Sequence, residues 1–308
     1  KLIVLRTSSS LAIIIVNWNG YQYSKSCLLS LRDLKYQNYE IILVDNGSAD
    51  KSGDRLKEEF PEVRLISLKT NTGFTGGNNA GIEYALKAKK DLIMLLNNDT
   101  VVTPDFADIL VKRLESNEKI GAVQPKIMFN KERSIIWNGG TKFSKIWFTT
   151  KTIGLGQKDN GQHDLVKDVP WITGCCFLVR SSVIKEVGTL DNHYFAYYED
   201  VDWSFRIKRA GYKLIYEPSA LIFHEVGKAN ENMESFGEGN LSPFSHYVNM
   251  RNHIFVVRKH AKGIAWATSF LYQFYKLFGY SLYFLFRGRF KKLKASIRGF
   301  YHGVTFQV

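Results

Sequence analysis

Short apolar runs alternate with longer amphipathic stretches along the first third of the chain. The apolar runs that are typical of strands cover residues 11–16, 40–44, 63–68 and 91–96. Stretches with helical spacing of apolar positions lie between them, at residues 21–34, 50–60 and 77–87. Strands that alternate with helices indicate βαβ units, whose strands pair mainly in parallel. The pattern therefore predicts an α/β fold with a mixed, mainly parallel sheet flanked by helices.

The pattern changes after residue 120. Short strand-like runs fill residues 121–223 together with one clear helix, residues 200–210, which ends before Gly211. Farther along, residues 264–286 carry polar side chains at every third or fourth position, and the other positions are mostly Trp, Phe, Leu and Ile. This spacing predicts a C-terminal amphipathic helix with a narrow polar stripe.

The role of this helix depends on what its broad apolar face contacts. Its length approaches that of a bilayer-spanning helix, but Gln273 and Lys276 at its middle disfavour a transmembrane span. A helix that lies in the membrane interface is favoured. Docking of the apolar face on the protein itself is the alternative.

Basic residues concentrate in the same region. The chain has a formal net charge of +13, and residues 239–308 contribute +11 of it because they contain no Asp or Glu. The first 238 residues carry the remaining +2. A basic segment on a near-neutral body indicates an anionic partner, either a membrane or a nucleic acid. The amphipathic helix favours the membrane, with the basic run 287–294 contacting anionic lipid headgroups.

Length and composition limit the class of protein. With 308 residues, 45% of them hydrophobic, the chain can form one large domain or two smaller ones and is not disordered. Its cysteines, Cys27, Cys175 and Cys176, form no Cys-x-x-Cys pair. This argues against a disulfide framework or a cysteine-rich zinc site and fits a reducing, cytoplasmic setting. The apolar stretch in residues 1–6 is too short for a signal peptide.

Carboxylates beside apolar runs are the first candidates for chemistry. Asp99 follows the predicted strand 91–96, so it should project at the strand's carboxyl end, where open α/β sheets bind ligands. Asp99 could instead cap the next helix, but Thr103 and Pro104 already supply an N-cap and a first-turn proline. We therefore favour metal or phosphate binding by Asp99.

Other motifs have structural interpretations when each is taken singly. The glycine-rich stretch 71–79 is predicted to be a loop that lets backbone approach a ligand, although it matches neither the dinucleotide-binding nor the P-loop pattern. Asp45 could begin an Asn-Gly turn, and His224 at a strand end could simply be packed. Glu199 and Asp200 would be favourable at a helix N-terminus through the helix dipole.

Taken in order, these motifs resemble a known family. The segments that carry the resemblance are 15–20, 44–48, 71–81, 96–99, 173–174, 195–206 and His224, spread over residues 10–260. The chain resembles the inverting family 2 glycosyltransferases of GT-A fold, especially the rhamnosyltransferase-like branch that builds bacterial surface polysaccharides. The resemblance implies a GT-A domain over residues 1–240, with a donor-binding half at about 10–118 and an acceptor half at about 119–240, followed by a membrane-associating region at 241–308.

The resemblance also implies roles for individual residues. Asp200, beside Glu199, would be the catalytic base, and Asp99 with His224 would bind the metal. Asp45 would read the base of the donor nucleotide. The implied donor-binding residues are Asn17, Asn19, Asp45, Asn71, Gly73, Gly76, Asn78 and Asn97. The implied acceptor-binding residues are Trp171, Thr173, Gly174 and Trp203.

One position departs from the family pattern. Asn97 stands where many members place the first Asp of the Asp-x-Asp signature, so weaker metal affinity and a contact from Asn97 to the ribose are expected. A divalent cation, Mn²⁺ or Mg²⁺, would neutralise the diphosphate leaving group. An acceptor hydroxyl deprotonated by Asp200 would then attack in line and invert the anomeric centre.

The expected function is transfer of a sugar from a nucleoside diphosphate sugar to a glycan or lipid-linked glycan, at the inner face of the cell membrane. TDP-rhamnose is the favoured donor by resemblance alone, and UDP-dependent galactofuranosyl or N-acetylhexosaminyl transfer is the alternative. A nucleotidyltransferase would release pyrophosphate instead. A non-enzymatic membrane-surface or nucleic-acid-binding protein would use the basic segment but leaves the carboxylates unexplained, so no nucleic acid partner is expected.

Overall fold

The protein is an α/β structure built on one mixed sheet. A computed structural model describes residues 8–225 and 241–307. The main path of the sheet runs β10-β12-β6-β11-β4-β1-β2-β3, with β5 beside β12 and β7 beside β6. Its strands are β1 (Leu11–Asn17), β2 (Tyr39–Asp45), β3 (Arg64–Ser67), β4 (Leu92–Leu96), β5 (Thr100–Val102), β6 (Ile120–Phe129), β7 (Ile136–Asn138), β10 (Lys167–Asp168), β11 (Cys176–Arg180) and β12 (Lys213–His224).

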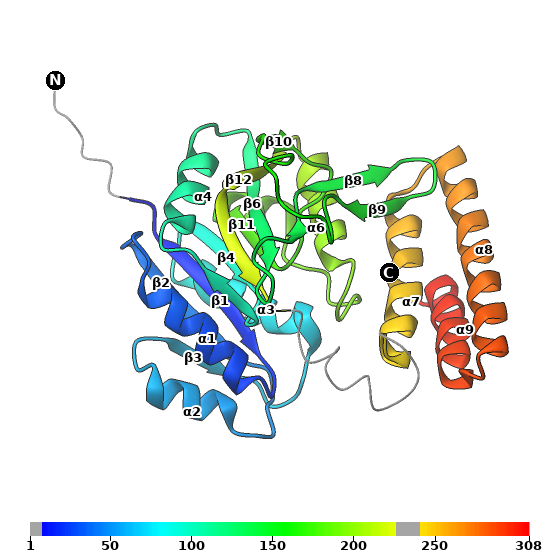
Figure 1. The fold of residues 1–308 in the computed structure, drawn as a ribbon, viewed down its shortest axis with the longest axis horizontal. Coiled ribbons are helices and arrows are strands. Elements are labelled where there is room, and N and C mark those ends of the chain that lie inside the picture. The colour runs from blue at the N-terminus through cyan, green and yellow to red at the C-terminus, as the bar shows by residue number, and fades with distance from the viewer. Residues whose placement is uncertain (1–7, 226–240, 308) are drawn as a thin grey trace.

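Helices cover both faces of this sheet (Figure 1). They are α1 (Tyr21–Arg32), α2 (Ser52–Glu59), α3 (Gly73–Lys87), α4 (Phe106–Glu115), α5 (Ser181–Val187) and α6 (Glu199–Arg209). Two apolar clusters fill the interfaces: one includes Leu28 of α1 and Phe106 of α4. The other includes Ile82 of α3 and Ile207 of α6. Strands β3, β2, β1 and β4 pair in parallel, whereas β11 runs antiparallel between β4 and β6. The mixed, mainly parallel sheet is therefore confirmed.

The parallel strands bring their carboxyl ends to one edge. Asn17 at the end of β1 is in register with Asp45 at the end of β2, and Asp45 is in register with Ser67 of β3. Strand β4 ends at Leu96, just before Asn97 and Asp99. This edge is the one at which the sequence predicts a ligand site.

Two local predictions are wrong. The stretch 71–79 is not a loop, because α3 begins at Gly73, whose φ of +77° and whose contact with the Asn46 side chain set the start of the helix. Thr103 does not cap a helix, because its hydroxyl donates to Leu221 O and α4 begins only at Phe106. Asp99 is followed by strand β5 and could not have capped a helix in any case.

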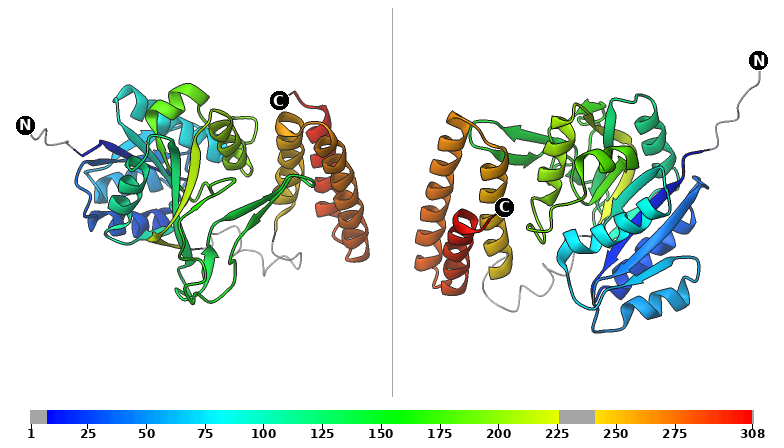
Figure 2. Two further views of the ribbon diagram at one scale, coloured as in Figure 1. Left: turned by 90° about the horizontal axis from the view of Figure 1, so that it is seen from above. Right: turned by 180° about the vertical axis from the view of Figure 1, so that it is seen from behind.

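Three C-terminal helices form a layer beside the sheet domain: α7 (Pro243–His260), α8 (Ile264–Phe286) and α9 (Phe290–Thr305). Both Figure 1 and Figure 2 show the hairpin of β8 (Thr141–Ser144) and β9 (Thr149–Thr152) reaching from the sheet domain toward this layer. Within residues 8–225 and 241–307, no helix combines the length and hydropathy needed to cross a membrane. The expected domain boundary at residue 240 lies outside the described residues.

Helix α8 has the predicted bounds, and its polar stripe faces inward. Ser269 and Gln273 are fully buried, whereas Tyr275 is 75% exposed and Phe278 64% exposed. Most of the apolar face is therefore not covered by the described part of the protein, although Phe284 is buried against His246 of α7 and Phe270 packs against the apolar cluster of α7. The other exposed large hydrophobic residues of α8 are Ile264, Trp266, Leu271, Phe274, Leu282, Tyr283, Leu285 and Phe286.

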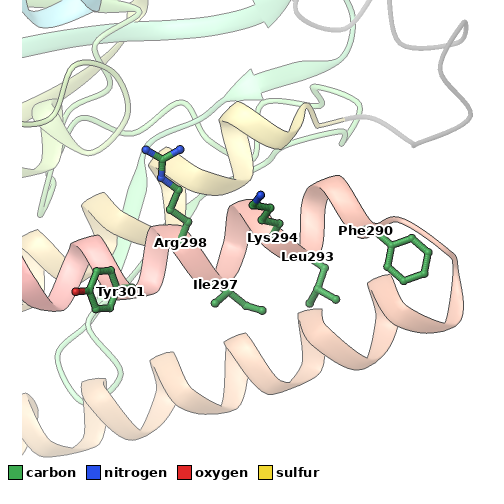
Figure 3. Close-up of a pocket in the computed structure, with 6 residues that line it drawn as sticks. All are labelled: Phe290, Leu293, Lys294, Ile297, Arg298 and Tyr301. Atoms are coloured by element: carbon green, nitrogen blue, oxygen red, sulfur yellow. The ribbon is translucent and has the colours of Figure 1, made fainter.

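Helix α9 continues this exposed surface. A shallow cavity of about 440 Å³ lies along it. Figure 3 shows that, among the side chains lining this cavity, Lys294 and Arg298 point away from Leu293 and Ile297. Phe274 of α8 contacts Phe300 of α9 with ring centroids 4.9 Å apart, so the two faces adjoin. Lys292, expected to contact headgroups, is instead buried. The lining residues of the cavity are Phe290, Leu293, Lys294, Ile297, Arg298 and Tyr301.

Candidate active site

Two adjoining cavities lie at the carboxyl edge of the parallel strands. The first, about 270 Å³, is called the strand-edge cavity, and the second, about 590 Å³, is called the acidic cavity. Phe74, Asn97 and Asp99 line both, so the cavities form one continuous cleft. The strand-edge cavity is lined by Val16, Trp18, Asn46, Asn71, Gly73, Phe74, Asn78, Leu96, Asn97, Asn98, Asp99 and Phe195.

Four of the expected donor-binding residues, Asn71, Gly73, Asn78 and Asn97, line the strand-edge cavity. The buried Asn46 side chain orders this wall, because its Nδ2 donates to Asn71 Oδ1 and Gly73 O at 3.1 and 2.9 Å. Because Gly73 begins α3, the positive end of the α3 dipole faces the cavity and favours an anionic ligand there.

The sequence interpretation missed the aromatic walls of this cavity. Trp18 is 55% exposed, and together with Phe74 and Phe195 it lines the cavity. Trp18 could have been predicted as a site residue, because it is an aromatic residue between two asparagines at the end of a predicted strand. Phe195 could not be found in this way, because it is 121 positions after Phe74 in the chain and only folding brings the two together.

Two expected donor-binding residues are structural. Asn17 is fully buried: its Nδ2 donates to Asp45, Ser48 and Ser52, and its Oδ1 accepts from Ser24, which leaves no atom for a ligand. Gly76 lies within α3, where a Cβ would meet the Thr72 side chain at 2.5 Å. The predicted donor contact of Asn17 is therefore wrong, whereas Gly76 does not line the strand-edge cavity and its role stays a prediction.

Asn19 and Asp45 lie beside the strand-edge cavity without lining it. Asn19 Oδ1 accepts from the backbone N–H groups of Ala49 and Asp50 at 2.9 and 3.3 Å. Asp45 Oδ1 accepts from the Asn17 side chain at 2.9 Å. Both side chains therefore order the turn that follows β2.

Asp99 and His224 meet where the two cavities join. His224 ends β12, which pairs with β5 so that His224 is opposite Thr100, the residue after Asp99. His224 Nε2 lies 3.1 Å from Asp99 Oδ1. The His224 ring packs edge-on against Trp137 at 4.5 Å, and its Nδ1 is buried without a hydrogen-bond partner among the described residues. The structure thus brings together the two side chains that the sequence proposed as metal ligands.

These two side chains fit a cation site only in part. A carboxylate oxygen and an imidazole nitrogen are ligands for Mn²⁺, and the carboxylate also suits Mg²⁺. In residues 8–225 and 241–307, no group of three or more His, Cys, Asp or Glu side chains could hold a metal ion by itself. A cation at Asp99 and His224 would therefore need further ligands from a bound molecule.

Glu199 and Asp200 open α6 on the wall of the acidic cavity. Asp200 Oδ2 accepts from Gly174 N–H at 2.9 Å and Oδ1 accepts from Val201 N–H at 2.8 Å. Burial raises the pKa of Asp200 to about 6, and these backbone N–H groups oppose the rise because they stabilise the carboxylate.

Glu199 differs from its neighbour. Burial, and then the charge of Asp200, raise the pKa of Glu199 well above its usual range. Its Oε2 is buried and has no hydrogen-bond partner among the described residues. Backbone N–H groups therefore stabilise the charged form of Asp200, whereas burial and the charge of Asp200 favour the protonated form of Glu199.

Of the expected acceptor-binding residues, Trp171, Thr173 and Gly174 line the acidic cavity. Trp203 does not, and that prediction is wrong. Its ring is fully buried and stacks on Phe177 with centroids 4.9 Å apart, and its Nε1 donates to Gly188 O. Cavity-lining residues that the sequence interpretation missed are Trp137, Thr150, Thr152, Tyr198, Ser245 and Asn249.

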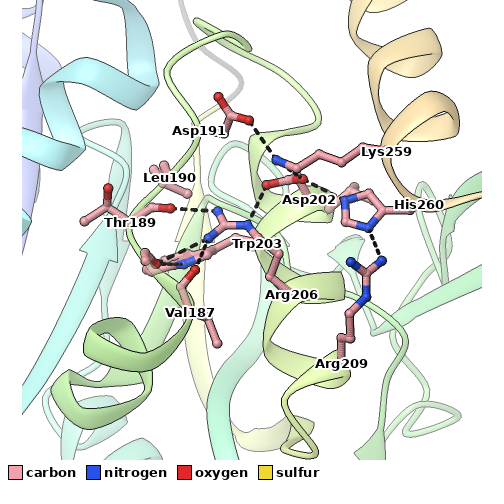
Figure 4. Close-up of polar contacts among 12 residues, drawn as sticks. Val187, Thr189, Leu190, Asp191, Asp202, Trp203, Arg206, Arg209, Lys259 and His260 are labelled. Carbon is pink, nitrogen blue, oxygen red and sulfur yellow. Dashed lines mark hydrogen bonds and ion pairs between the residues drawn. The ribbon is translucent and has the colours of Figure 1, made fainter. Parts of the chain in front are cut away.

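Asp202, on the same helical turn, serves a structural network (Figure 4). Arg206 Nε donates to it at 2.9 Å, which forms an i,i+4 ion pair along α6. His260 and Lys259 of α7 approach its Oδ1 at 2.7 and 2.9 Å. Burial would raise the pKa of Asp202, but the His260 hydrogen bond and the Arg206 and Lys259 charges hold it below its usual range. Asp202 thus ties α6 to α7 and is unsuited to act as a base.

Comparison with known proteins agrees with this arrangement. A family model described as glycosyl transferase family 2 matches residues 12–188, more than half of the chain. The chain is 27% identical over 231 residues to the N-acetylglucosaminyl-diphospho-decaprenol L-rhamnosyltransferase of Mycobacterium tuberculosis, covering 70% of this chain and 75% of that protein. It is 26% identical over 201 residues to a low-salt glycan biosynthesis hexosyltransferase of Haloferax volcanii, covering 65% and 62% respectively.

Solved structures show the same fold at low identity. GalNAc-T7 with UDP, GalNAc and Mn²⁺ matches with a TM-score of 0.62 and 17% identity, covering 82% of this chain and 48% of that one. S. aureus TarS in complex with UDP-GlcNAc matches with a TM-score of 0.61 and 13% identity, covering 93% and 79%. The chain therefore belongs to glycosyl transferase family 2 and has the GT-A fold.

Proposed function

We propose that this protein is an inverting glycosyltransferase that moves a sugar from a nucleoside diphosphate sugar to a hydroxyl of a glycan or lipid-linked glycan in cell-surface polysaccharide synthesis. The observation that carries the proposal is the continuous cleft, in which Asn97 and Asp99 separate an asparagine-rich cavity from a cavity walled by Asp200. A donor in the first cavity would present its anomeric carbon to an acceptor in the second.

The donor would lie in the strand-edge cavity. Asn97 offers an amide group for the ribose, Asn78 offers its Oδ1 because its Nδ2 already donates to Phe74 O at 2.9 Å, and the N-terminus of α3 favours the diphosphate. Asp45, at the edge of the cavity, is the residue proposed to contact the base. Trp18, exposed on the same wall, offers an aromatic face against which a flat base would pack.

Asp99 and His224 are the residues proposed to hold a divalent cation, Mn²⁺ or Mg²⁺, with diphosphate oxygens completing the coordination. The cation, when bound, neutralises the charge that develops on the departing nucleoside diphosphate. The imidazole favours Mn²⁺, since nitrogen ligands suit it better than Mg²⁺. Asn97 at the first position of the signature supplies no charge, so weak metal affinity is part of the proposal.

Asp200 is proposed to take the proton from the acceptor hydroxyl. Its carboxylate is held by two backbone N–H groups and has a pKa of about 6, which leaves it ionised and basic at neutral pH. No nucleophilic side chain is required, because the acceptor oxygen attacks the anomeric carbon in a single displacement and the configuration inverts. The aromatic rings of Trp137 and Trp171 in the same cavity suit stacking against a sugar ring.

The proposed donor is TDP-rhamnose. Its support is the similarity of the chain to a rhamnosyltransferase that, by its name, acts on a diphosphodecaprenol-linked N-acetylglucosamine. UDP-linked galactofuranose or N-acetylhexosamine is the alternative, and TarS in complex with UDP-GlcNAc shares the fold.

The proposed location is peripheral, on the cytoplasmic face of the cell membrane. Helix α8 exposes its apolar face while its polar stripe is buried, the reverse of a helix on a water-facing surface. Lys291, Lys294 and Arg298 are exposed on α9, which adjoins α8, and residues 239–308 contain no acidic side chain. An exposed apolar face in a region whose charged residues are all basic suits an anionic bilayer interface.

The test is a screen of nucleotide sugars with the purified full chain, Mn²⁺ or Mg²⁺ and a lipid-linked glycan acceptor, read by release of nucleoside diphosphate and by NMR of the product's anomeric configuration. Release of TDP from TDP-rhamnose with inversion is the expected result. Retention of configuration would overturn the mechanism, and release of pyrophosphate would identify a nucleotidyltransferase. If the protein binds vesicles but neither transfers a sugar nor binds a nucleotide, the non-enzymatic alternative is favoured.

A further inference from the structure

The segment that leads into Glu199 and Asp200 has an unusual backbone. Phe195, Tyr197 and Tyr198 have φ angles of 64°, 67° and 71°, in the left-handed region that non-glycine residues rarely adopt. A backbone conformation of this kind is strained and persists only where surrounding contacts fix it. The conformation of this segment sets the position of α6, and therefore of Asp200.

One buried side chain of α7 contacts three backbone carbonyl groups of this segment. Asn252 is fully buried, and its Nδ2 donates to Tyr194 O, Ala196 O and Tyr197 O at 2.9, 2.8 and 2.8 Å. The preceding residue, Arg251, donates to Tyr194 O at 2.9 Å and to His193 O at 3.1 Å. The residues with positive φ lie among these carbonyl groups, and all three carbonyl groups reach one amide, so the contacts of Asn252 depend on this backbone conformation.

The next residue of α7 supports the same segment from its other end. The ring of His253 stacks on Tyr198, with centroids 5.1 Å apart and planes 15° apart. His253 Nε2 lies 2.8 Å from Phe148 O, which can only accept, so Nε2 carries the proton and Nδ1 accepts from Gln273 Nε2 of α8 at 3.0 Å. Through His253, the helix with the exposed apolar face is connected to the residue just before Glu199.

We propose that Asn252 is a positioning residue for Asp200: it holds the left-handed segment 194–198 in the one conformation that aims the Asp200 carboxylate into the acidic cavity, and His253 braces the same segment against α8. The proposal rests on the proposed function for its kinetic consequence, though not for its structural one. Helix α7 is then part of the catalytic machinery, even though it lies outside the matched residues 12–188.

The experiment compares Asn252→Asp, Asn252→Ala and the control Ile254→Ala in the full chain. Asn252→Asp keeps the side-chain volume but replaces the donating NH₂ group by a carboxylate oxygen, which cannot donate to the three carbonyl oxygens. Ile254 is fully buried on the same helix but packs against Gly303 of α9 instead of the segment. Melting temperature is measured for all three, so that loss of stability is separated from loss of position.

Three readouts follow. Both Asn252 variants should lower kcat about 10- to 100-fold, the scale of a small misplacement of a catalytic group, with the donor KM within about twofold. The pH midpoint of kcat should move in these variants and not in Ile254→Ala. Hydrogen exchange of the amides in residues 193–203 should rise in the Asn252 variants alone.

The exchange measurement does not depend on turnover. If the wild type transfers no sugar from any nucleotide sugar, the proposed function fails, and exchange in residues 193–203 still decides the positioning role. Unchanged exchange and unchanged kcat in Asn252→Asp would overturn the proposal. The proposal would also be overturned if Ile254→Ala lost as much kcat as the Asn252 variants when its melting temperature fell by the same amount. That result would show a general effect of α7 stability on the rate.

Discussion

Three carboxylates within the first turn of α6 have different surroundings. Asp200 is stabilised by two backbone N–H groups, Glu199 lacks a partner for Oε2 among the described residues, and Asp202 is surrounded by Arg206, Lys259 and His260. The same chemical group is thereby the proposed base at Asp200, a carboxyl whose protonated form is favoured by burial at Glu199, and a structural anion at Asp202. Sequence spacing alone does not separate these roles, because all three lie within four positions.

Replacing Asp200 by Asn removes the proposed base while keeping its volume. We expect Asp200→Asn to lower kcat by roughly 10²–10⁴, the usual contribution of a positioned proton acceptor. Donor affinity should change little, since Asp200 lines the acidic cavity and not the strand-edge cavity. Steady-state kinetics with donor and acceptor varied separately measures both effects.

The pH profile gives the sign of the effect. A base works only when ionised, so with a pKa of about 6 for Asp200 the wild-type kcat should fall as pH drops below about 6 and level off above it. The neighbouring Glu199→Gln variant is the control and should keep most of the rate, because burial already favours the uncharged form of Glu199. Loss of nucleotide binding in Asp200→Asn, with near-normal turnover at saturation, would instead place Asp200 at the donor site and make Glu199 the better candidate for the base.

Asp99 supplies the only proposed charged metal ligand from the protein. Asp99→Ala should abolish the metal-dependent rise in melting temperature produced by TDP or UDP, and should abolish turnover, while the metal-free melting temperature stays close to that of the wild type. His224→Ala should have a milder or comparable effect. Asp168→Ala removes a carboxylate paired with Lys208 on the surface and is the control. If turnover and the nucleotide-induced rise in melting temperature depend on the metal in His224→Ala as they do in the wild type, the His224 imidazole has a packing role only.

Among the helices, α8 is the one for which we expect direct binding to a membrane through its exposed apolar face. Leu271→Asp combined with Phe278→Asp should weaken binding to anionic vesicles at least tenfold, because charges would enter the apolar face. The melting temperature should hardly change, since both side chains are more than 60% exposed. Leu165→Asp, at a 71% exposed position in the sheet domain, is the control. Vesicle sedimentation at two salt concentrations measures the effect, and undiminished binding of the double variant would place the membrane contact elsewhere.

The close packing of α9 on α7 depends on two glycines of α9, Gly299 and Gly303. A Cβ at Gly299 would meet Tyr247 O at 2.5 Å, whereas a Cβ at Gly279 of α8 meets nothing within 4 Å. Gly299→Ala should therefore destabilise the protein by about 1–3 kcal/mol, the usual cost of forcing atoms into a packed interface. Gly279→Ala should stabilise it by about 0.5–1 kcal/mol, because alanine loses less chain entropy in a helix. Denaturant unfolding of both variants checks the contrast, and equal changes would contradict it.

The molecule combines a GT-A sheet domain with a three-helix layer through the contacts of α7. Lys259 and His260 bind Asp202, Asn252 binds segment 194–197, and Asn249 lines the acidic cavity. A membrane contact made by α8 and α9 would hold this cavity at a fixed height above the lipid surface. Such an arrangement suits an acceptor whose sugar is linked to a lipid.

A comparison of two acceptors follows from this arrangement. Anionic vesicles should raise kcat/KM for a lipid-linked acceptor embedded in them, because attachment raises the local concentration of enzyme and acceptor. They should not raise it for a water-soluble glycan with the same sugars. The Leu271→Asp, Phe278→Asp variant should lose this difference while keeping its rate on the soluble acceptor. Equal stimulation of both acceptors would argue against the proposed geometry.

Local patterns in the chain were sufficient for the elements and for part of the site. Apolar alternation predicted the strands and helices around β1, β2 and β4, because each depends on the spacing of neighbouring residues. Asp99 and Asn97 were placed at a strand's carboxyl end for the same reason, and the 3.6-residue period predicted α8 with its actual bounds. The family resemblance, rather than spacing, supplied the roles assigned to Asp200 and His224.

Contacts between distant segments decided the rest. Asn17 and Asn78 look alike in the sequence, yet folding surrounds the first with four partners and leaves the second on a cavity wall. Trp203 is in the core because Phe177 lies across from it, and α8 faces outward because its polar residues find partners such as His253 on α7. The hydrogen bonds from Asn252 to segment 194–197 could not be predicted from the sequence, because the bonded residues lie 55 to 58 positions before Asn252 in the chain. Spacing determines which face of an element is apolar, but only the packed tertiary structure determines what that face meets.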